Sequence, residues 1–120
     1  MFPNRNLYIT FLFLLITSGV RAKIGRASYY TEWKYQFGSC GYSLSSVQNG
    51  MIVALSNKYQ GAKQSCGKYI QVKGPKGTIK VKVTDTCPSC SADKIDLSNV
   101  AFQKIGNLNA GIINVEWNFV

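Results

Sequence analysis

Apolar and polar residues alternate in two neighbouring segments in the second half of the chain. In YIQVKG, Ile70 and Val72 alternate with polar residues, and in GTIKVKVTD, residues 77–85, isoleucine and valine alternate with lysine. A period of two residues is typical of a strand with one buried face. Because only the short segment KGPKG joins the two runs, they predict an antiparallel hairpin.

Three further segments predict strands. The last segment, GIINVEWNFV, places Ile113, Val115 and Trp117 on one face, which predicts a half-buried strand with Trp117 in the core. The segments GRASYY and MIVALS, residues 25–30 and 51–56, predict two shorter strands, the second of them buried.

One segment has the pattern of a helix. In DLSNVAFQKIGNL, residues 96–108, Ser98 is placed to cap the start, Phe102 and Ile105 supply an apolar side, and Gly106 stands where a helix would end. The chain therefore predicts an all-β domain with one short helix. Short strands in so small a chain favour closure into a barrel, because closure removes exposed sheet edges.

The first 22 residues predict a secretory signal peptide. They contain a basic lead, an apolar run from Leu7 to Ile16 and a small or polar stretch that ends at Ala22. The alternative is an uncleaved membrane anchor, but so short an apolar run spans a bilayer poorly. We therefore expect a secreted, extracellular protein whose single domain occupies residues 23–120, with no membrane association after cleavage.

The four cysteines all lie in the predicted domain, and an even number in a small secreted chain predicts two disulfides. Of three pairings we favour Cys87 with Cys90, since Pro88 bends that segment, and Cys40 with Cys66, which would join two glycine-flanked loops. A zinc site is the alternative, but the chain has one CxxC and no histidine. We expect neither a metal nor another cofactor.

The formal net charge of +9 favours anionic partners. Candidates are pectin-like polysaccharide, peptidoglycan, a membrane surface and nucleic acid. A secreted protein rarely meets nucleic acid, so we expect a cell-wall polymer as the partner of a monomeric protein. A solvated basic surface without a specific anion site is the other interpretation, because the lysines are spread along the chain.

Two of the five acidic residues are candidates for chemistry. Asp85 follows Val83 with the same strand parity, so we expect its carboxylate on the core side at the rim of the barrel. Asp96 follows after the cysteine loop, at the start of the predicted helix. Two carboxylates beside a rigid loop could serve a glycosidase. In the structural alternative, Asp85 accepts loop N–H groups and Asp96 helps to cap the helix.

Aromatic residues crowd the segment before Cys40: Tyr29, Tyr30, Trp33, Tyr35 and Phe37. Flat rings stack on sugars, so part of this cluster could line a polysaccharide groove. Tyr30, Trp33 and Tyr35 are the candidates, with Trp33 and Tyr35 expected to be the most exposed. The alternative is that the rings fill the core of a small barrel.

The segments GRASYY, YIQVKGPKGTIKVKVTD and IDLSNVAFQKIGNLNAGIINVEWNFV together resemble the first domain of an expansin. The resemblance runs from Gly25 to Val120. It implies a six-stranded double-psi β-barrel, the fold shared with barwin-like proteins, rare-lipoprotein-A-like proteins and one family of endoglucanases. It also implies a wall-associated protein that binds polysaccharide and loosens it without hydrolysis.

The resemblance assigns roles to three residues. Asp85 matches the aspartate on which expansin function depends, and Asp96 matches a second acid of the same groove. Ser28 stands at the position where bacterial expansins have a threonine. The Ser28 hydroxyl could donate to Asp85 from that position. Cys87 replaces a groove tyrosine, and no aspartate near GRASYY supplies the base of the endoglucanases.

Two other functions stay open. The first is glycan cleavage by a lytic enzyme that uses Asp85 as both acid and base. The second is a protein-binding effector or protease inhibitor on a barwin-like scaffold, for which Asp85→Asn would leave function intact.

Overall fold

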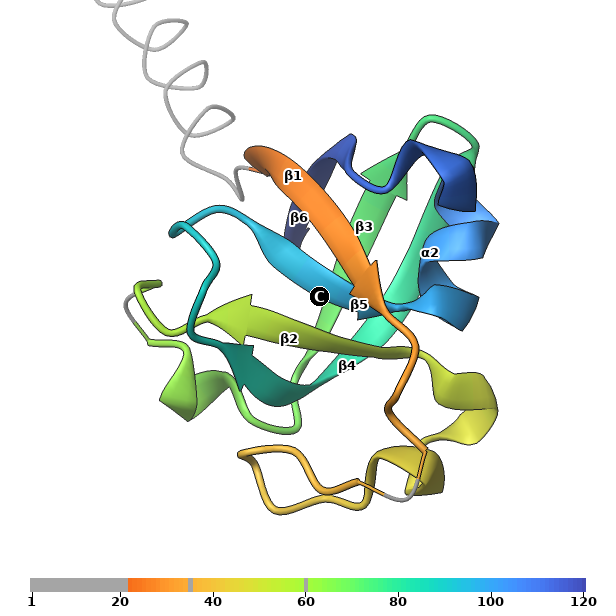
Figure 1. Ribbon diagram of the computed structural model, residues 1–120. Helices are drawn as coiled ribbons and strands as arrows, with labels where there is room; N and C mark the ends of the chain where they lie inside the picture. The colour runs from red at the N-terminus through yellow and green to blue at the C-terminus, as the bar shows by residue number, and fades with distance from the viewer. Residues whose placement is uncertain (1–21, 35, 60) are drawn as a thin grey trace, which may run out of the picture.

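The computed structural model describes residues 22–34, 36–59 and 61–120. Residues 1–21 of the predicted signal peptide, and Tyr35, lie outside the described residues. Six strands form one closed barrel in the spatial order β1-β5-β2-β4-β3-β6 (Figure 1). The strands are β1 (Lys23–Tyr30), β2 (Ile52–Ser56), β3 (Tyr69–Gly74), β4 (Gly77–Cys87), β5 (Ile95–Ser98) and β6 (Ile113–Phe119).

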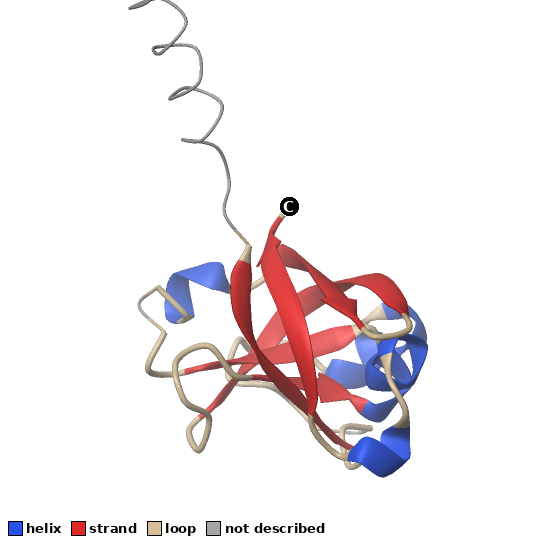
Figure 2. Ribbon diagram, turned by 90° about the horizontal axis from the view of Figure 1, so that it is seen from above, coloured by secondary structure: helices blue, strands red, loops and turns tan. Residues whose placement is uncertain are grey.

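The barrel mixes parallel and antiparallel pairs. β1 pairs with β5, and β2 with β4, in parallel, while the other four neighbouring pairs are antiparallel. The predicted hairpin is confirmed as β3 and β4, which are joined at Gly74 and Gly77. Seen from above, the strands wrap around a closed interior and the helical segments lie outside it (Figure 2).

Aliphatic side chains from all six strands fill the interior of the barrel, with branched side chains from β2 to β6 and Ala27 from β1. Trp117 is fully buried in this cluster, as predicted. The helix α2 (Asn99–Ile105) adds Phe102 and Ile105 to the same cluster. Burial of these side chains is the main contribution that holds so small a barrel closed.

The segment before the helix is a strand that the sequence pattern did not predict. Residues 95–98 form β5, so Asp96 lies within a strand and not at the start of the helix. The cap of α2 is Ser98, whose Oγ accepts from the Ala101 N–H at 3.1 Å, and Gly106 follows its last turn. The predicted capping role of Ser98 is confirmed, and the alternative in which Asp96 helps to cap the helix is wrong.

Two disulfides close the loops around one side of the barrel. Cys40 bonds to Cys66, and Cys87 bonds to Cys90, as predicted. Short 3-10 helices occupy the connections, η1 (Leu44–Ser46), η2 (Gln48–Gly50), η3 (Lys63–Ser65) and η4 (Leu108–Ala110). Within the described ranges, no helix combines the length and the apolar character needed to cross a membrane.

Candidate functional site

Four residues on four adjacent strands form one row across the barrel. Ser28 of β1 pairs with Asp96 of β5, Asp96 pairs with Ala54 of β2, and Ala54 pairs with Asp85 of β4. Directly opposed residues in neighbouring strands place their side chains on the same face of the sheet. The row therefore brings both predicted acids and the predicted serine to one surface.

That surface is the outside of the barrel, since the neighbouring residues Ala27, Leu97 and Leu55 point into the core. Asp85 joins this outer face because β4 contains a bulge. Val83 pairs with Val53, but the next partner of β2, Ala54, pairs with Asp85, so Thr84 is an extra residue. An extra residue reverses the side to which the following side chains point. The prediction that Asp85 shares the inward face of Val83 is therefore wrong.

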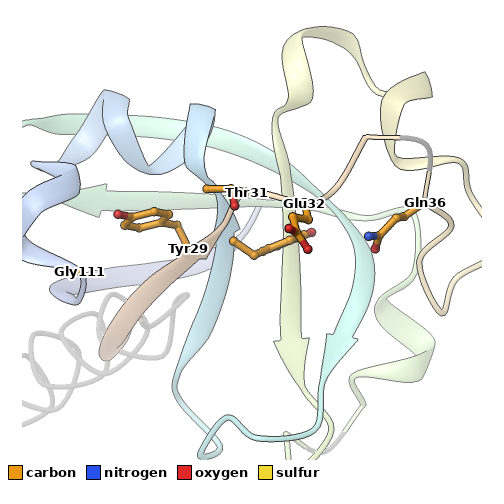
Figure 3. Close-up of a pocket in the computed structure, with 6 residues that line it drawn as sticks. Tyr29, Thr31, Glu32, Gln36 and Gly111 are labelled. Atoms are coloured by element: carbon orange, nitrogen blue, oxygen red, sulfur yellow. The ribbon is translucent and has the colours of Figure 1, made fainter.

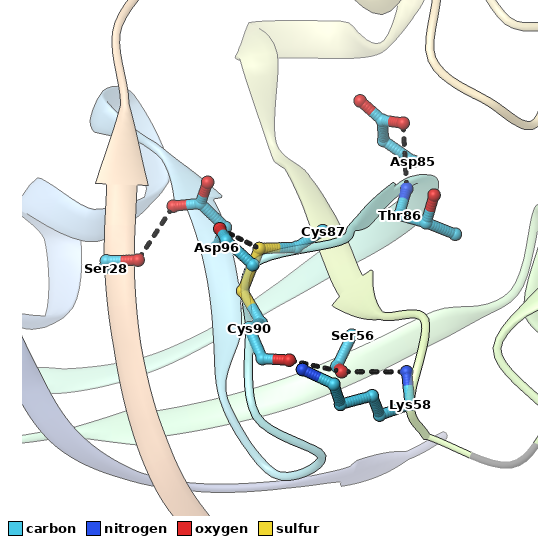
Figure 4. Close-up of a disulfide and its surroundings, with 9 residues drawn as sticks. Ser28, Ser56, Lys58, Asp85, Thr86, Cys87, Cys90 and Asp96 are labelled. Carbon is cyan, nitrogen blue, oxygen red and sulfur yellow. Dashed lines mark hydrogen bonds between the residues drawn. A yellow bond between two sulfur atoms is a disulfide. The ribbon is translucent and has the colours of Figure 1, made fainter.

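The Cys87–Cys90 disulfide forms the floor between the two acids. Both cysteines pack against Ala54 in a small buried cluster separate from the main core. Figure 4 places the disulfide between Asp96 on one side and Asp85 on the other. The Ser56 hydroxyl donates to the Cys90 carbonyl at 2.8 Å, which ties this short loop to β2.

Asp85 anchors a neighbouring loop. Its Oδ1 accepts the N–H groups of Ser39 at 2.9 Å and Thr86 at 2.8 Å. The Thr86 hydroxyl also lies 3.2 Å from the Ser39 hydroxyl. This is the structural role that the sequence left open for Asp85. Because both N–H groups donate to Oδ1, Oδ2 is the carboxylate oxygen of Asp85 that can accept a hydrogen bond from a ligand.

Asp96 is held differently. The Ser28 hydroxyl donates to its Oδ1 at 3.0 Å, so the expectation that Ser28 donates to Asp85 is wrong. Burial raises the pKa of Asp96 above its ordinary value, and the negative charge of Asp85 adds to this rise. The bond from Ser28 and the charge of Lys94 act in the opposite direction.

Tyr30 completes the site. Burial, followed by the charges of Asp85 and Asp96, raises the pKa of its phenol, so the hydroxyl stays protonated at physiological pH. This hydroxyl is buried and has no hydrogen-bond partner in the described part of the chain. It is therefore an unpaired donor near two carboxylates, closed to solvent in this structure.

These side chains line a shallow groove, which we call the acid groove. A depression of about 250 Å³ contains Tyr30, Gln36, Asp85 and Asp96. Tyr30 and Gln36 also line a second hollow of about 660 Å³, together with Glu32 (Figure 3). Three of the five acidic residues of the chain thus share one surface.

The remaining aromatic candidates do not join this groove. Trp33 was expected to be exposed, but it is only 7% exposed and packs with Leu44 and Ile52. Its Nε1 donates to the Asn99 side-chain oxygen at 2.9 Å, which fixes the ring inside this second core. The expectation that Trp33 offers a ring face to sugars is therefore wrong. Tyr35 lies outside the described residues.

Sequence reasoning missed Glu32 and Gln36 as groove residues. They lie in the irregular segment after β1, where neither strand nor helix periodicity indicates which side chains converge. Within the described residues, no three histidine, cysteine, aspartate or glutamate side chains gather as a metal site requires.

Comparison with known proteins places the fold in a family. Residues 22–117 match the family described as lytic transglycolase. The chain is a member of this double-psi β-barrel family. An expansin of Bacillus subtilis, Expansin-YoaJ, is 38% identical over 96 residues, which cover 76% of this chain and 40% of that protein. The predicted double-psi fold and the resemblance to expansins are thus confirmed.

Two solved structures are similar over most of the chain. A Clavibacter michiganensis expansin in complex with cellohexaose has 33% identity and a TM-score of 0.76, and covers 83% of this chain. A Streptomyces papain inhibitor has 32% identity and a TM-score of 0.68, and covers the same share. This chain spans half of the expansin structure but 94% of the papain inhibitor.

Proposed function

We propose that this protein is a secreted, expansin-like protein that binds a cell-wall polysaccharide in the acid groove and loosens it without hydrolysis. The observation that carries the proposal is the row of Ser28, Asp96, Ala54 and Asp85 on one open barrel face. The cellohexaose bound to the related Clavibacter expansin supports a neutral glucan as ligand. The predicted signal peptide supports the extracellular location.

The groove has the donors and acceptors that such binding needs. Carboxylate oxygens of Asp85 and Asp96 accept sugar hydroxyls, and charged acceptors make stronger hydrogen bonds than neutral ones. The side-chain amide of Gln36, which also lines the groove, supplies N–H donors. A glycan chain that exchanges its interchain hydrogen bonds for these bonds is released from its neighbours, and no covalent bond breaks.

A second candidate is glycan cleavage, which the description of the matching family supports. In this candidate the acid would be Asp96, because burial raises the pKa of its carboxyl and thereby favours a proton donor. Asp85 is less suited, since Oδ1 is already occupied by two backbone N–H groups. Glycan cleavage that needs no activated water requires a single carboxyl group that acts first as the acid and then as the base.

A third candidate is inhibition of a protease, which the papain inhibitor relative supports. Phe37 is 72% exposed on the loop that Asp85 and the Cys40–Cys66 disulfide hold in place. A rigid loop with an exposed aromatic side chain is a suitable anchor for a protein partner. Papain inhibited by the wild-type protein but not by Phe37→Ser would support this candidate.

The test is sedimentation of the oxidised mature protein with cellulose, pectin-rich wall and peptidoglycan, followed by measurement of soluble sugar. Asp96→Asn removes a groove carboxylate, and Asp93→Asn is the matched control, since Asp93 is exposed and does not line the groove. We expect binding to cellulose without sugar release, weakened by Asp96→Asn only. Sugar release that this variant abolishes would favour cleavage. Absence of binding to all three materials would overturn the proposal.

A further inference from the structure

The outer face of β3 and β4 lies apart from the acid groove and has the opposite charge. In the antiparallel register, Tyr69 pairs with Lys82 and Gln71 pairs with Lys80. Their neighbours Ile70 and Val81 point into the core, so the polar partners share the outer face. At the end of the hairpin Lys73 continues this row of cations.

Two tyrosine rings are interleaved with these lysines. The Lys80 ammonium lies 4.9 Å from the centre of the Tyr69 ring, and the Lys82 ammonium lies 4.2 Å from the centre of the Tyr42 ring. Both distances are within the range of cation–π attraction, which holds the flexible side chains close to the sheet. We call Tyr42, Tyr69, Lys73, Lys80 and Lys82 the lysine–tyrosine face.

The acidic residues of the chain leave this face strongly positive. Of the five in the sequence, Asp85 and Asp96 line the acid groove and Glu32 lines the hollow that shares Tyr30 and Gln36 with it. Glu116 is the acid that pairs with this face, opposite Lys73 at its edge. Lys80 and Lys82 therefore have no carboxylate among their cross-strand partners. The +9 net charge of the chain is unevenly distributed between the two surfaces.

We propose that the lysine–tyrosine face is a second binding site, which takes a linear polyuronate, a glycan with carboxylate groups along its length. The lysines pair with the carboxylates, and the Tyr69 ring, 40% exposed, stacks on a sugar. The face has no arginine, so it offers point charges and not the bidentate fork that favours phosphate. A polyuronate cannot use the acid groove, because like charges repel it there.

The two surfaces thus divide the ligands by charge. β4 carries Lys80 and Lys82 on its outer face and Asp85 after its bulge, so one strand contributes to both sites. The loop that Asp85 anchors separates them, with Tyr42 on its lysine side. The lysine–tyrosine face would hold the protein to an acidic wall polymer while the acid groove binds a neutral glycan. This arrangement rests on the proposed function for the neutral ligand only.

The test measures binding of polygalacturonate by the oxidised mature protein at low salt and at 1 M salt. Lys80→Gln/Lys82→Gln removes two cations of the face, and Lys34→Gln/Lys104→Gln removes two exposed lysines elsewhere. We expect the first pair to weaken binding about fivefold or more, from the usual strength of exposed ion pairs. The control pair Lys34→Gln/Lys104→Gln should change the affinity for polygalacturonate less than twofold. In 1 M salt the wild-type protein should no longer bind polygalacturonate.

Three results would overturn the proposal. Equal weakening by both pairs would indicate general attraction by net charge. Unchanged affinity for polygalacturonate in both pairs of variants would exclude the lysine–tyrosine face as its binding site. Tighter binding to DNA or to anionic phospholipid vesicles than to polygalacturonate would assign the face to another partner. Cellohexaose binding by the lysine variants and by Asp96→Asn tests the acid groove separately. Failure of the lysine–tyrosine face is thus distinguished from failure of the proposed function. Melting temperatures of all variants check that the barrel is intact.

Discussion

Ser28 donates its hydroxyl to Asp96 at 3.0 Å, and the two residues are direct partners in the parallel pair of β1 and β5. This bond favours the charged form of the carboxyl, whereas burial favours the neutral form. We expect Ser28→Ala to raise the pKa of Asp96 further and Ser28→Thr, which keeps a hydroxyl, to leave it nearly unchanged. Carbon-13 NMR titration of the carboxyl measures this. Equal pKa values in the two variants would show that the bond has no influence.

The pKa of Asp96 also predicts how stability depends on pH. Because burial raises this pKa above the unfolded value of about 4, the stability gained from the protonated carboxyl is complete below pH 4. It is lost as the pH rises through the folded pKa. Asp96→Asn should therefore melt at a higher temperature than the wild type at pH 7, with the difference shrinking toward pH 4. A constant difference across this range would contradict the account.

Thr84, the extra residue of the bulge, has a buried hydroxyl with no partner in the described structure. An unpaired buried hydroxyl costs about 1–3 kcal/mol. We expect Thr84→Val, which has nearly the same shape, to increase the free energy of unfolding by about 1 kcal/mol. Chemical denaturation measures it. A variant less stable than the wild type would indicate that the hydroxyl has a partner after all.

The two disulfides should contribute differently to stability and to binding. Closure of the longer loop between Cys40 and Cys66 contributes about 3.5 kcal/mol in the chain-entropy account, and the short Cys87–Cys90 loop contributes about 2 kcal/mol. The Cys87–Cys90 bridge, however, forms the floor of the acid groove.

We therefore expect replacement of Cys87 and Cys90 by alanine to weaken glycan binding more than the loss of stability explains. The same change at Cys40 and Cys66 should lower stability more. Denaturation and cellulose sedimentation of both variants, at a temperature where each is folded, compare the effects. The reverse order of the two binding losses would contradict this assignment.

Lys23 lies over three aromatic rings, none of which lines the acid groove. Its Nζ is 5.3, 5.0 and 5.5 Å from the ring centres of Tyr59, Trp117 and Phe119. We expect Lys23→Met, which keeps a long apolar stem but removes the charge, to destabilise the fold by about 1 kcal/mol. Glycan binding should stay unchanged. A variant as stable as the wild type would show that only the stem matters.

Much of the barrel was predictable from local pattern. Alternation located the hairpin and the last strand, and Ser98 and Gly106 marked the ends of the helix. β5 was missed because its four residues, Ile95–Ser98, are too short for a period to be recognised and run directly into the helix. Its place depends on pairing with β1 and β2, which are distant in the sequence.

Only part of the candidate site was predictable: the sequence singled out Asp85, Asp96 and Ser28, which strand pairing brings to one face, but it missed Glu32 and Gln36. Parity assigned Asp85 to the inner face, since no local signal at Thr84 indicates a bulge. The position of Trp33 in a predicted loop suggested an exposed ring, but large aromatic side chains dominate burial in small domains, and Trp33 packs against Leu44 and Ile52. The partner of Ser28 was likewise set by strand register.

The most direct test of the central claim is nitrogen-15 NMR of the oxidised mature protein during titration with cellohexaose, with the solution assayed for shorter products. We predict that the amide signals that shift are those of Tyr30, Ser39, Asp85 and Asp96, that Asp96→Asn weakens the titration, and that the hexasaccharide stays intact. Shifts confined to other surfaces, or no shifts at all, would contradict binding in the acid groove. Shortened oligosaccharides would contradict loosening without hydrolysis.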